Sequence, residues 1–255
     1  GGTQTGFTLL KLLLILLFSA AALALSPAEQ QTRFAWDSEA TTLLGSGAFA
    51  VSLIYVNYAY SGWNAATYIS GELAAPQRGL PRVLSISTAV VAALYCLLNF
   101  VFLSVAPMDA MVGKVEVGVI AAEFAFGPQL GTFMGLLLAM LLVSTISAMI
   151  LAGPRVLHRI GQDYPRFAPL ARENRDGIPV TAILLQSGTA LAFLWTASFE
   201  QILVFSGATM ALNTFATVLG LFILRWRQPH LPRPFRVTLY PITPLIFLGI
   251  TGWTL

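Results

Sequence analysis

Charged residues are scarce in this chain of 255 residues. Lysine, arginine, aspartate and glutamate together make up 10% of it, whereas an ordinary soluble domain carries about a quarter. Hydrophobic residues make up 56%. This balance excludes a soluble globular domain and a disordered chain. The net charge is only +3, and the basic residues lie in a few loops beside apolar segments, which excludes a nucleic-acid-binding protein.

Cysteine and histidine are also nearly absent. The single cysteine, Cys96, lies in an apolar segment and cannot form an intrachain disulfide or a cysteine-based metal cluster. The two histidines, His158 and His230, lie in basic loops. The sequence has no HExxH or GxSxG motif and no glycine-rich phosphate loop with lysine. We therefore expect no enzyme activity, no metal site and no cofactor.

Long apolar segments are what the chain does contain. A helix that crosses a bilayer needs roughly 20 largely apolar residues, and seven segments approach or exceed this length. They are continuously apolar rather than alternating, which excludes the strands of a β-barrel. We predict an all-α, multi-pass helix bundle in the plasma membrane or the bacterial inner membrane. The predicted spans are residues 6–25, 44–70, 83–106, 130–152, 179–197, 202–224 and 237–255.

The distribution of basic residues predicts the orientation of these spans. The connections after the second, fourth and sixth spans carry 11 of the 14 lysines and arginines, and the alternate connections carry two. Basic residues concentrate in cytoplasmic loops. These three connections are therefore predicted to be cytoplasmic, and the first span to run from inside to outside.

The second predicted span, residues 44–70, is longer than one crossing needs. Its middle, from Asn57 to Asn64, is rich in polar and small residues, and Gly62 permits a break near residues 59–64. Backbone groups freed by a break cannot face lipid, and broken helices of this kind hold substrates and ions in secondary transporters. The alternative is a continuous helix whose tyrosine and tryptophan side chains pack on neighbouring helices.

Two charged residues have two interpretations each. Lys11 lies little more than one turn inside the first span, where a lysine either snorkels to the headgroups or has a function within the membrane. Glu72 lies in the loop after the second span and either pairs with a basic residue as an inner gate or is a solvated loop charge. We expect Pro76 and Pro81 to end helices and to shape a short turn here.

Small polar residues in two further spans have the same ambiguity. Ser144 and Ser147 lie near one face of the fourth span, and Ser206 and Gly207 lie in the sixth. Such residues either reach a bound ligand or bond to the backbone and to neighbouring helices.

Several stretches together resemble the amino acid–polyamine–organocation (APC) superfamily, and within it the L-type amino acid transporter branch. The order and spacing of the matching stretches hold along essentially the whole chain. The resemblance implies a fragment, the family's fifth to eleventh helices, from an inverted-repeat transporter fold with a broken helix. The absence of an initiator methionine agrees with a piece of a longer protein. The matching stretches are residues 7–13 (fifth helix with its lysine), 60–64 with Glu72, Pro76 and Pro81 (broken sixth helix and following loop), 152–156 (end of the eighth) and 224–236 (loop between the tenth and eleventh).

The resemblance also implies a binding site. In such transporters carbonyls of the unwound sixth helix hold the substrate's amino group, an aromatic residue at the position of Tyr58 acts as a gate, and Lys11 resembles a lysine that replaces a sodium ion. The inner gate at Glu72 departs from the family pattern, because Gly71 and Ala75 stand where the family often has an acidic residue and an asparagine. The implied substrate-binding residues are Tyr58, Ala59, Tyr60, Ser61, Gly62, Trp63, Ser144, Ser147, Ser206, Gly207 and Met210.

The function implied by the resemblance is secondary transport of neutral amino acids by alternating access, as a sodium-independent exchanger or a proton-linked carrier. Its partners would be the amino acid substrate and the lipid bilayer, with any accessory subunit unidentified and no nucleic acid. One alternative is a carrier of polyamines or cationic amino acids, which would favour an acidic side chain at the break, where the sequence has none. Another is a non-transporting accessory membrane subunit, which a continuous second helix would favour.

Overall fold

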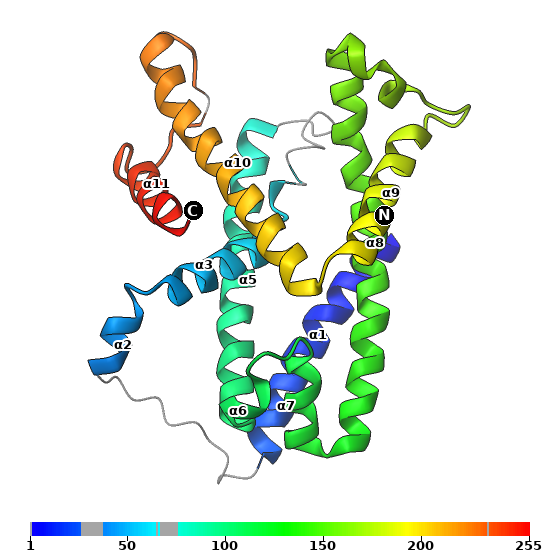
Figure 1. The fold of residues 1–255 in the computed structure, drawn as a ribbon, viewed down its shortest axis with the longest axis vertical. Coiled ribbons are helices and arrows are strands. Elements are labelled where there is room, and N and C mark those ends of the chain that lie inside the picture. Colours follow the sequence, from blue (N-terminus) through cyan, green and yellow to red (C-terminus); the bar gives the residue numbers. More distant parts are fainter. Residues whose placement is uncertain (1, 27–37, 65, 67–75, 234) are drawn as a thin grey trace. The chain divides into compact units, whose positions relative to one another are not determined.

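The computed structural model describes residues 2–26, 38–64, 66, 76–233 and 235–255. These residues form helices joined by turns and loops, and none of them forms a β-strand (Figure 1). The prediction of an all-α, polytopic helix bundle is confirmed.

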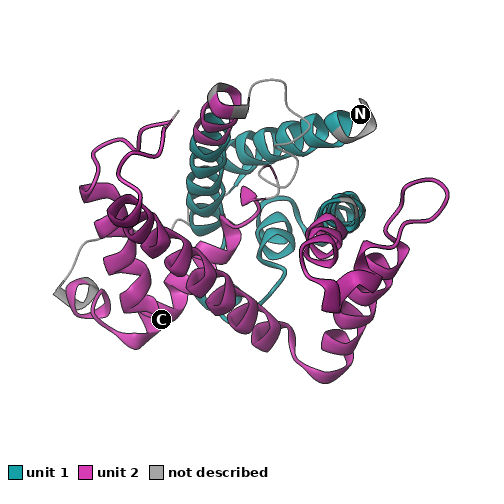
Figure 2. Cartoon of the chain, turned by 90° about the horizontal axis from the view of Figure 1, so that it is seen from above, with its two compact units in different colours: residues 1–35, 86–152 teal, residues 36–85, 153–255 magenta. Residues whose placement is uncertain are grey.

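The chain divides into two compact units, which are described separately (Figure 2). Unit 1 comprises residues 1–35 and 86–152, and unit 2 comprises residues 36–85 and 153–255. The chain passes between the units at three places: the boundaries after residues 85 and 152 fall inside long helices, and the one after residue 35 lies outside the described residues.

Unit 1 is built around the contact of α1 (Gly2–Leu25) with α7 (Val117–Phe126). Phe18 of α1 is buried, and its ring lies edge-on to Phe126 at a centroid distance of 6.0 Å. Alanines on both helices are fully buried, so the backbones can approach closely. Unit 1 also contains the larger part of α5 (Pro76–Val105), α6 (Met108–Met111) and the larger part of α8 (Pro128–Asp163).

In unit 2, α10 (Phe199–Arg227) packs against both α3 (Gly47–Ala59) and α11 (Ile242–Thr254). Gly252 of α11 lies against the ring of Phe215, so that a Cβ atom at this glycine would be 3.3 Å from the ring. The rings of Phe49 and Trp253 lie 6.2 Å apart, which brings the beginning of α3 next to the end of α11. The remaining elements are α2 (Ser38–Leu43), the 3₁₀ helix η3 (Pro165–Ala171) and α9 (Val180–Thr196).

Local sequence signals fix where α3 and α10 begin. The hydroxyl of Ser46 accepts a hydrogen bond from the N–H of Phe49 at 3.2 Å and caps α3. Ser198 and Gln201 form a reciprocal capping box at the start of α10, with bonds of 3.0 and 3.3 Å. These caps satisfy backbone N–H groups that would otherwise lack partners at the helix ends.

The expectation that Pro76 and Pro81 end helices is wrong. Pro76 is the first residue of α5, and Pro81 lies inside the same helix. Proline is well suited to the first position of a helix, because its missing N–H would have no intrahelical partner there and its φ angle is already helical. Pro81 is five residues further on, where proline costs one backbone hydrogen bond.

Four helices in the described part of the chain are long and apolar enough to cross a membrane: Thr5–Leu25, Gly79–Val105, Pro128–Asp163 and Phe199–Arg227. They overlap four of the predicted spans. The other three predicted spans each overlap a shorter apolar helix, namely Gly47–Ala59, Val180–Thr196 and Ile242–Thr254. The first of these helices is shorter than the predicted span 44–70, because the backbone leaves the regular helix after Ala59.

Candidate functional site

The end of α3 is an irregular segment in the middle of an apolar stretch. The regular helix ends at Ala59, and the backbone turns through residues 60–63, with Gly62 at a φ of +103°. The N–H of Ser61 donates to the carbonyl of Tyr58 at 2.9 Å, and the N–H of Gly62 donates to Oδ1 of Asn64 at 3.3 Å. This turn lies within residues 59–64, where the sequence predicts the break.

Gly207 of α10 lies directly against α3. A Cβ atom at Gly207 would be 2.8 Å from Cγ2 of Ile54 and 3.5 Å from Cβ of Tyr58. Ile54, Gly207 and Ala211 are all buried, so two small residues one turn apart on α10 allow close approach of α3 (Figure 1). The structure therefore brings Tyr58 and Gly207, two of the predicted site residues, into contact.

The predicted site residues of unit 2 differ in how exposed they are. Trp63 is 49% exposed, and Ala59 and Gly62 are also exposed. Half-buried positions are occupied by Tyr58, Tyr60, Ser61, Ser206 and Met210.

The serines of the fourth predicted span belong to unit 1 and are not placed relative to the break. Ser144 is buried, and its hydroxyl has no hydrogen-bond partner among the described residues. Ser147, one turn further along α8, is exposed. Glu72, the predicted inner gate, lies outside the described residues. A shared site for these serines and α3 therefore stays a prediction.

One contact between α3 and the first turn of α10 was not predicted from the sequence. Oη of Tyr55 donates a hydrogen bond to Oε1 of Glu200 at 3.4 Å. The two residues are 145 positions apart, so no local pattern could pair them. The only hint in the sequence is that Tyr55 and Glu200 are polar residues within two apolar helices. The contact links α3, one turn before Tyr58, to the helix that carries Gly207.

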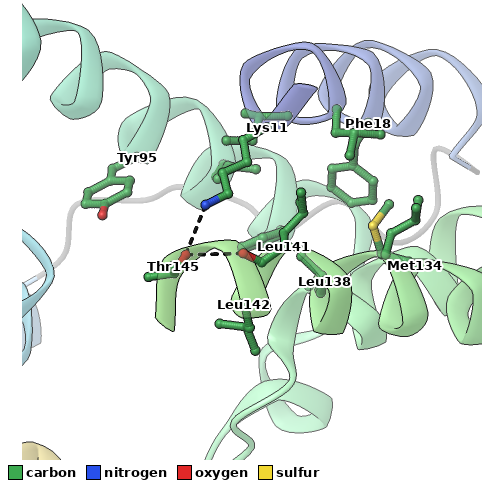
Figure 3. Close-up of a pocket in the computed structure, with 14 residues that line it drawn as sticks. Lys11, Phe18, Tyr95, Met134, Leu138, Leu141, Leu142 and Thr145 are labelled. Atoms are coloured by element: carbon green, nitrogen blue, oxygen red, sulfur yellow. Dashed lines mark hydrogen bonds between the residues drawn. The ribbon is translucent and has the colours of Figure 1, made fainter. Parts of the chain in front are cut away.

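The side chain of Lys11 lies at an apolar cavity of about 560 Å³ in unit 1 (Figure 3). Its ammonium group reaches from α1 to α8 and donates a hydrogen bond to Oγ1 of Thr145 at 3.0 Å. The hydroxyl of Thr145 also lies 3.3 Å from the carbonyl oxygen of Leu141, to which it donates. This contact supports a structural role for Lys11, because the charge is bound by protein. The cavity is otherwise lined mainly by leucines and aromatic residues of α1, α5 and α8.

We expect Thr145→Val to lower the thermal unfolding midpoint of the full-length protein. The substitution keeps the shape of the side chain but removes the acceptor for Lys11, and a hydrogen bond to a charged group contributes about 1.5–3 kcal/mol. Thr132→Val is the matched control, since the hydroxyl of Thr132 bonds back to Pro128 in the same helix. Equal midpoints for the two variants would contradict a structural role for the Lys11 contact.

The described residues include no cluster of three histidine, cysteine, aspartate or glutamate side chains that could hold a metal ion. The arrangement offers instead an interrupted apolar helix, a close helix–helix contact at a glycine, and bonded polar side chains. Together with the four long apolar helices, these features fit an integral, multi-pass membrane protein.

Comparison with known proteins identifies the family. The family model described as "Amino acid permease" matches residues 1–253. The chain therefore belongs to the amino acid permease family, and the resemblance to L-type permeases of the APC superfamily is confirmed.

Three curated relatives share about a quarter of their aligned residues with this chain, and each of them is longer than it. "Large neutral amino acids transporter small subunit 2" of Mus musculus is 28% identical over 211 residues, which cover 79% of this chain and 38% of that protein. "Asc-type amino acid transporter 1" of Mus musculus is 27% identical over 214 residues, with the same coverage. "Solute carrier family 7 member 12" of Mus musculus is 25% identical over 252 residues, covering 97% and 52%. The chain thus spans about two fifths to one half of these relatives.

Proposed function

We propose that the full-length protein is a secondary transporter of neutral amino acids that works by alternating access, as an exchanger or a proton-linked carrier. The observation that carries this proposal is the interrupted helix at residues 60–63, next to the glycine of α10. Membership of the amino acid permease family supports transport as the activity. The names of the relatives, which include a transporter of large neutral amino acids, support the substrate class.

The backbone at the end of α3 suits recognition of a substrate's amino group. A helix end presents carbonyl groups that lack an intrahelical partner. The carbonyl of Tyr58 accepts a bond from the N–H of Ser61 at 2.9 Å, and a carbonyl oxygen has two lone pairs. We assign the carbonyls of Tyr58, Ala59 and Ser61 to the amino group, and the aromatic ring of Tyr58 to the role of gate.

The charges around the break favour a neutral substrate over a polyamine or a cationic amino acid. Residues 57–66 contain no aspartate or glutamate. Glu200 contacts α3, but it lies in the first turn of α10, seven residues before Gly207. Seven residues of helix are about 10 Å long, and the carboxylate of Glu200 is already bonded to Tyr55. Among the described residues, the charge of a cationic side chain would therefore find no acidic partner at the break itself.

Counterflow in proteoliposomes tests the proposal. The full-length protein would be reconstituted into vesicles preloaded with unlabelled neutral amino acids, and labelled leucine or alanine would be added outside without sodium. An exchanger accumulates label only in preloaded vesicles, because each inward step requires an outward step with bound substrate. A proton-linked carrier accumulates label in empty vesicles when a proton gradient is imposed.

The outcomes separate the rival functions. Accumulation of labelled arginine or spermidine in place of leucine would reassign the substrate class. No accumulation of any neutral amino acid, with or without preloading or a proton gradient, would contradict the transporter proposal for these substrates. Such a result would favour a non-transporting accessory subunit.

A further inference from the structure

A second cavity, of about 640 Å³, lies in unit 2 between the end of α10 and the start of α11. Three arginines line it, Arg225, Arg233 and Arg236, together with Tyr240 and apolar side chains. None of the described residues that line it is acidic. The sequence has no aspartate or glutamate from residue 201 to residue 255, so no neighbour along the chain neutralises these charges.

The guanidinium group of Arg225 is held in a fixed position at this cavity. It lies 3.7 Å above the ring centroid of Tyr240, and that ring also packs on Phe222 at 5.4 Å. The Nε atom of Arg225 is buried and has no hydrogen-bond partner among the described residues. A buried donor without an acceptor is costly, and such groups in native proteins usually have a partner. An oxygen acceptor bound at Arg225 would remove that cost.

Arg233 is oriented by the backbone at the end of α10. Its two terminal nitrogens donate to the carbonyls of Pro229 at 2.9 Å and Gln228 at 2.8 Å. These bonds fix the positive charge at the cavity before any ligand arrives. Preorganised binding groups lose little conformational freedom on binding, which favours affinity. The cavity therefore combines two immobilised guanidinium groups with the exposed side chain of Arg236.

The surroundings of the cavity indicate the membrane surface. Trp226 and Phe235, which flank the lining residues along the chain, are 82% and 55% exposed, and Leu239 is 68% exposed. Aromatic residues are enriched where a protein meets the headgroup region. The positive-inside rule predicts that this loop lies on the cytoplasmic side. Basic pockets beside membrane helices on that side bind anionic lipid headgroups.

We propose that this cavity binds the phosphate group of an anionic phospholipid from the cytoplasmic leaflet. Guanidinium groups recognise phosphate by paired, charge-assisted hydrogen bonds. Arg225 supplies its buried Nε, Arg233 a fixed charge, and Arg236 a charge at the opening. The exposed apolar side chains around the opening contact the acyl region of the same lipid. Lipid binding of this kind is separate from substrate recognition at α3, so it can be tested without a transport assay.

The test is lipid binding to the full-length protein in detergent, measured by native mass spectrometry with phosphatidylglycerol and phosphatidylcholine. We expect the protein to retain phosphatidylglycerol in preference to phosphatidylcholine. Arg225→Gln should weaken that binding about tenfold, as expected for the loss of one charge-assisted hydrogen bond. Arg227→Gln is the matched control, since it removes the same charge from the end of the same helix but does not line the cavity.

Further variants and a competitor complete the test. Arg236→Gln, at an exposed loop position with little risk to folding, should also weaken binding. Arg225→Lys should bind with intermediate strength, because it keeps the charge and loses the Nε donor. If Arg225→Gln and Arg227→Gln weakened lipid binding equally, the binding would depend only on general surface charge. That result would overturn the proposal. Displacement of the lipid by an equal concentration of inorganic phosphate would make the ligand a soluble phosphate and would also overturn it.

Discussion

Gly62→Ala is expected to lower amino acid exchange by the full-length protein by at least about tenfold. Gly62 has a φ of +103°, a conformation that L side chains rarely adopt, and no atom lies within 4 Å of a Cβ atom built there. The cost of alanine therefore comes from the backbone alone, and it amounts to about 1–3 kcal/mol for a residue held in a disfavoured conformation. Alanine should favour continuation of the helix and so remove the carbonyl groups that we assign to the substrate. The measurement is the initial rate of counterflow.

Two further variants separate this backbone effect from a general effect of added volume. Gly47→Ala lies at the start of the same helix, where a Cβ atom also meets nothing within 4 Å and φ is not positive. The exchange rate of Gly47→Ala should equal that of the wild type, because alanine fits a helical position at least as well as glycine does. Gly62→Asn should retain more activity than Gly62→Ala, because asparagine tolerates positive φ better. Wild-type exchange by Gly62→Ala would show that transport does not need the interrupted helix.

The long helices of the described chain could be expected from the sequence because their apolar segments are long. The first predicted span, residues 6–25, ends where α1 ends, and the turn after Ala59 lies inside the predicted interval 59–64. Helix ends that extend beyond apolar segments were harder to place. α10 starts at Phe199 because Ser198 and Gln201 cap it, and it continues to Arg227, past the apolar span predicted to end at residue 224. Capping residues and a basic last turn extend a helix without adding hydrophobicity.

The contacts of the candidate site could not be predicted, because they depend on the register between distant helices. Nothing in the sequence pairs Ile54 with Gly207, or Tyr55 with Glu200. The stacking of Arg225 on Tyr240 depends on a loop that reverses the chain between two helices. Spacing and resemblance thus lead to a prediction of which residues line the site, while the contacts between those residues can be read only from the packed structure.

Gly207→Ala is expected to reduce both exchange and thermal stability of the full-length protein. A Cβ atom at this position would lie 2.8 Å from Cγ2 of Ile54 and 3.4 Å from its carbonyl oxygen, so either the side chain of Ile54 must change its conformation or α3 must move away from α10. Inserting a methyl group into a packed contact costs about 1–3 kcal/mol. The new methyl group would also contact Tyr58, whose Cβ would be 3.5 Å from it. We expect counterflow to fall about tenfold and the unfolding midpoint to fall by several degrees.

Gly220→Ala in the same helix is the matched control, because a Cβ atom at Gly220 has no neighbour within 4 Å. It should leave exchange intact and stabilise the protein slightly, since alanine in a helix is favoured over glycine by about 0.5–1 kcal/mol. Ile54→Ala removes the methyl group that collides with the new side chain. The double variant Gly207→Ala/Ile54→Ala should therefore exchange faster than Gly207→Ala alone, with a coupling of about 1 kcal/mol in a double-mutant cycle. If the losses of exchange in the two single variants simply added in the double variant, removing the colliding methyl group would not have restored activity. The effect of Gly207→Ala would then not arise from its contact with Ile54 of α3.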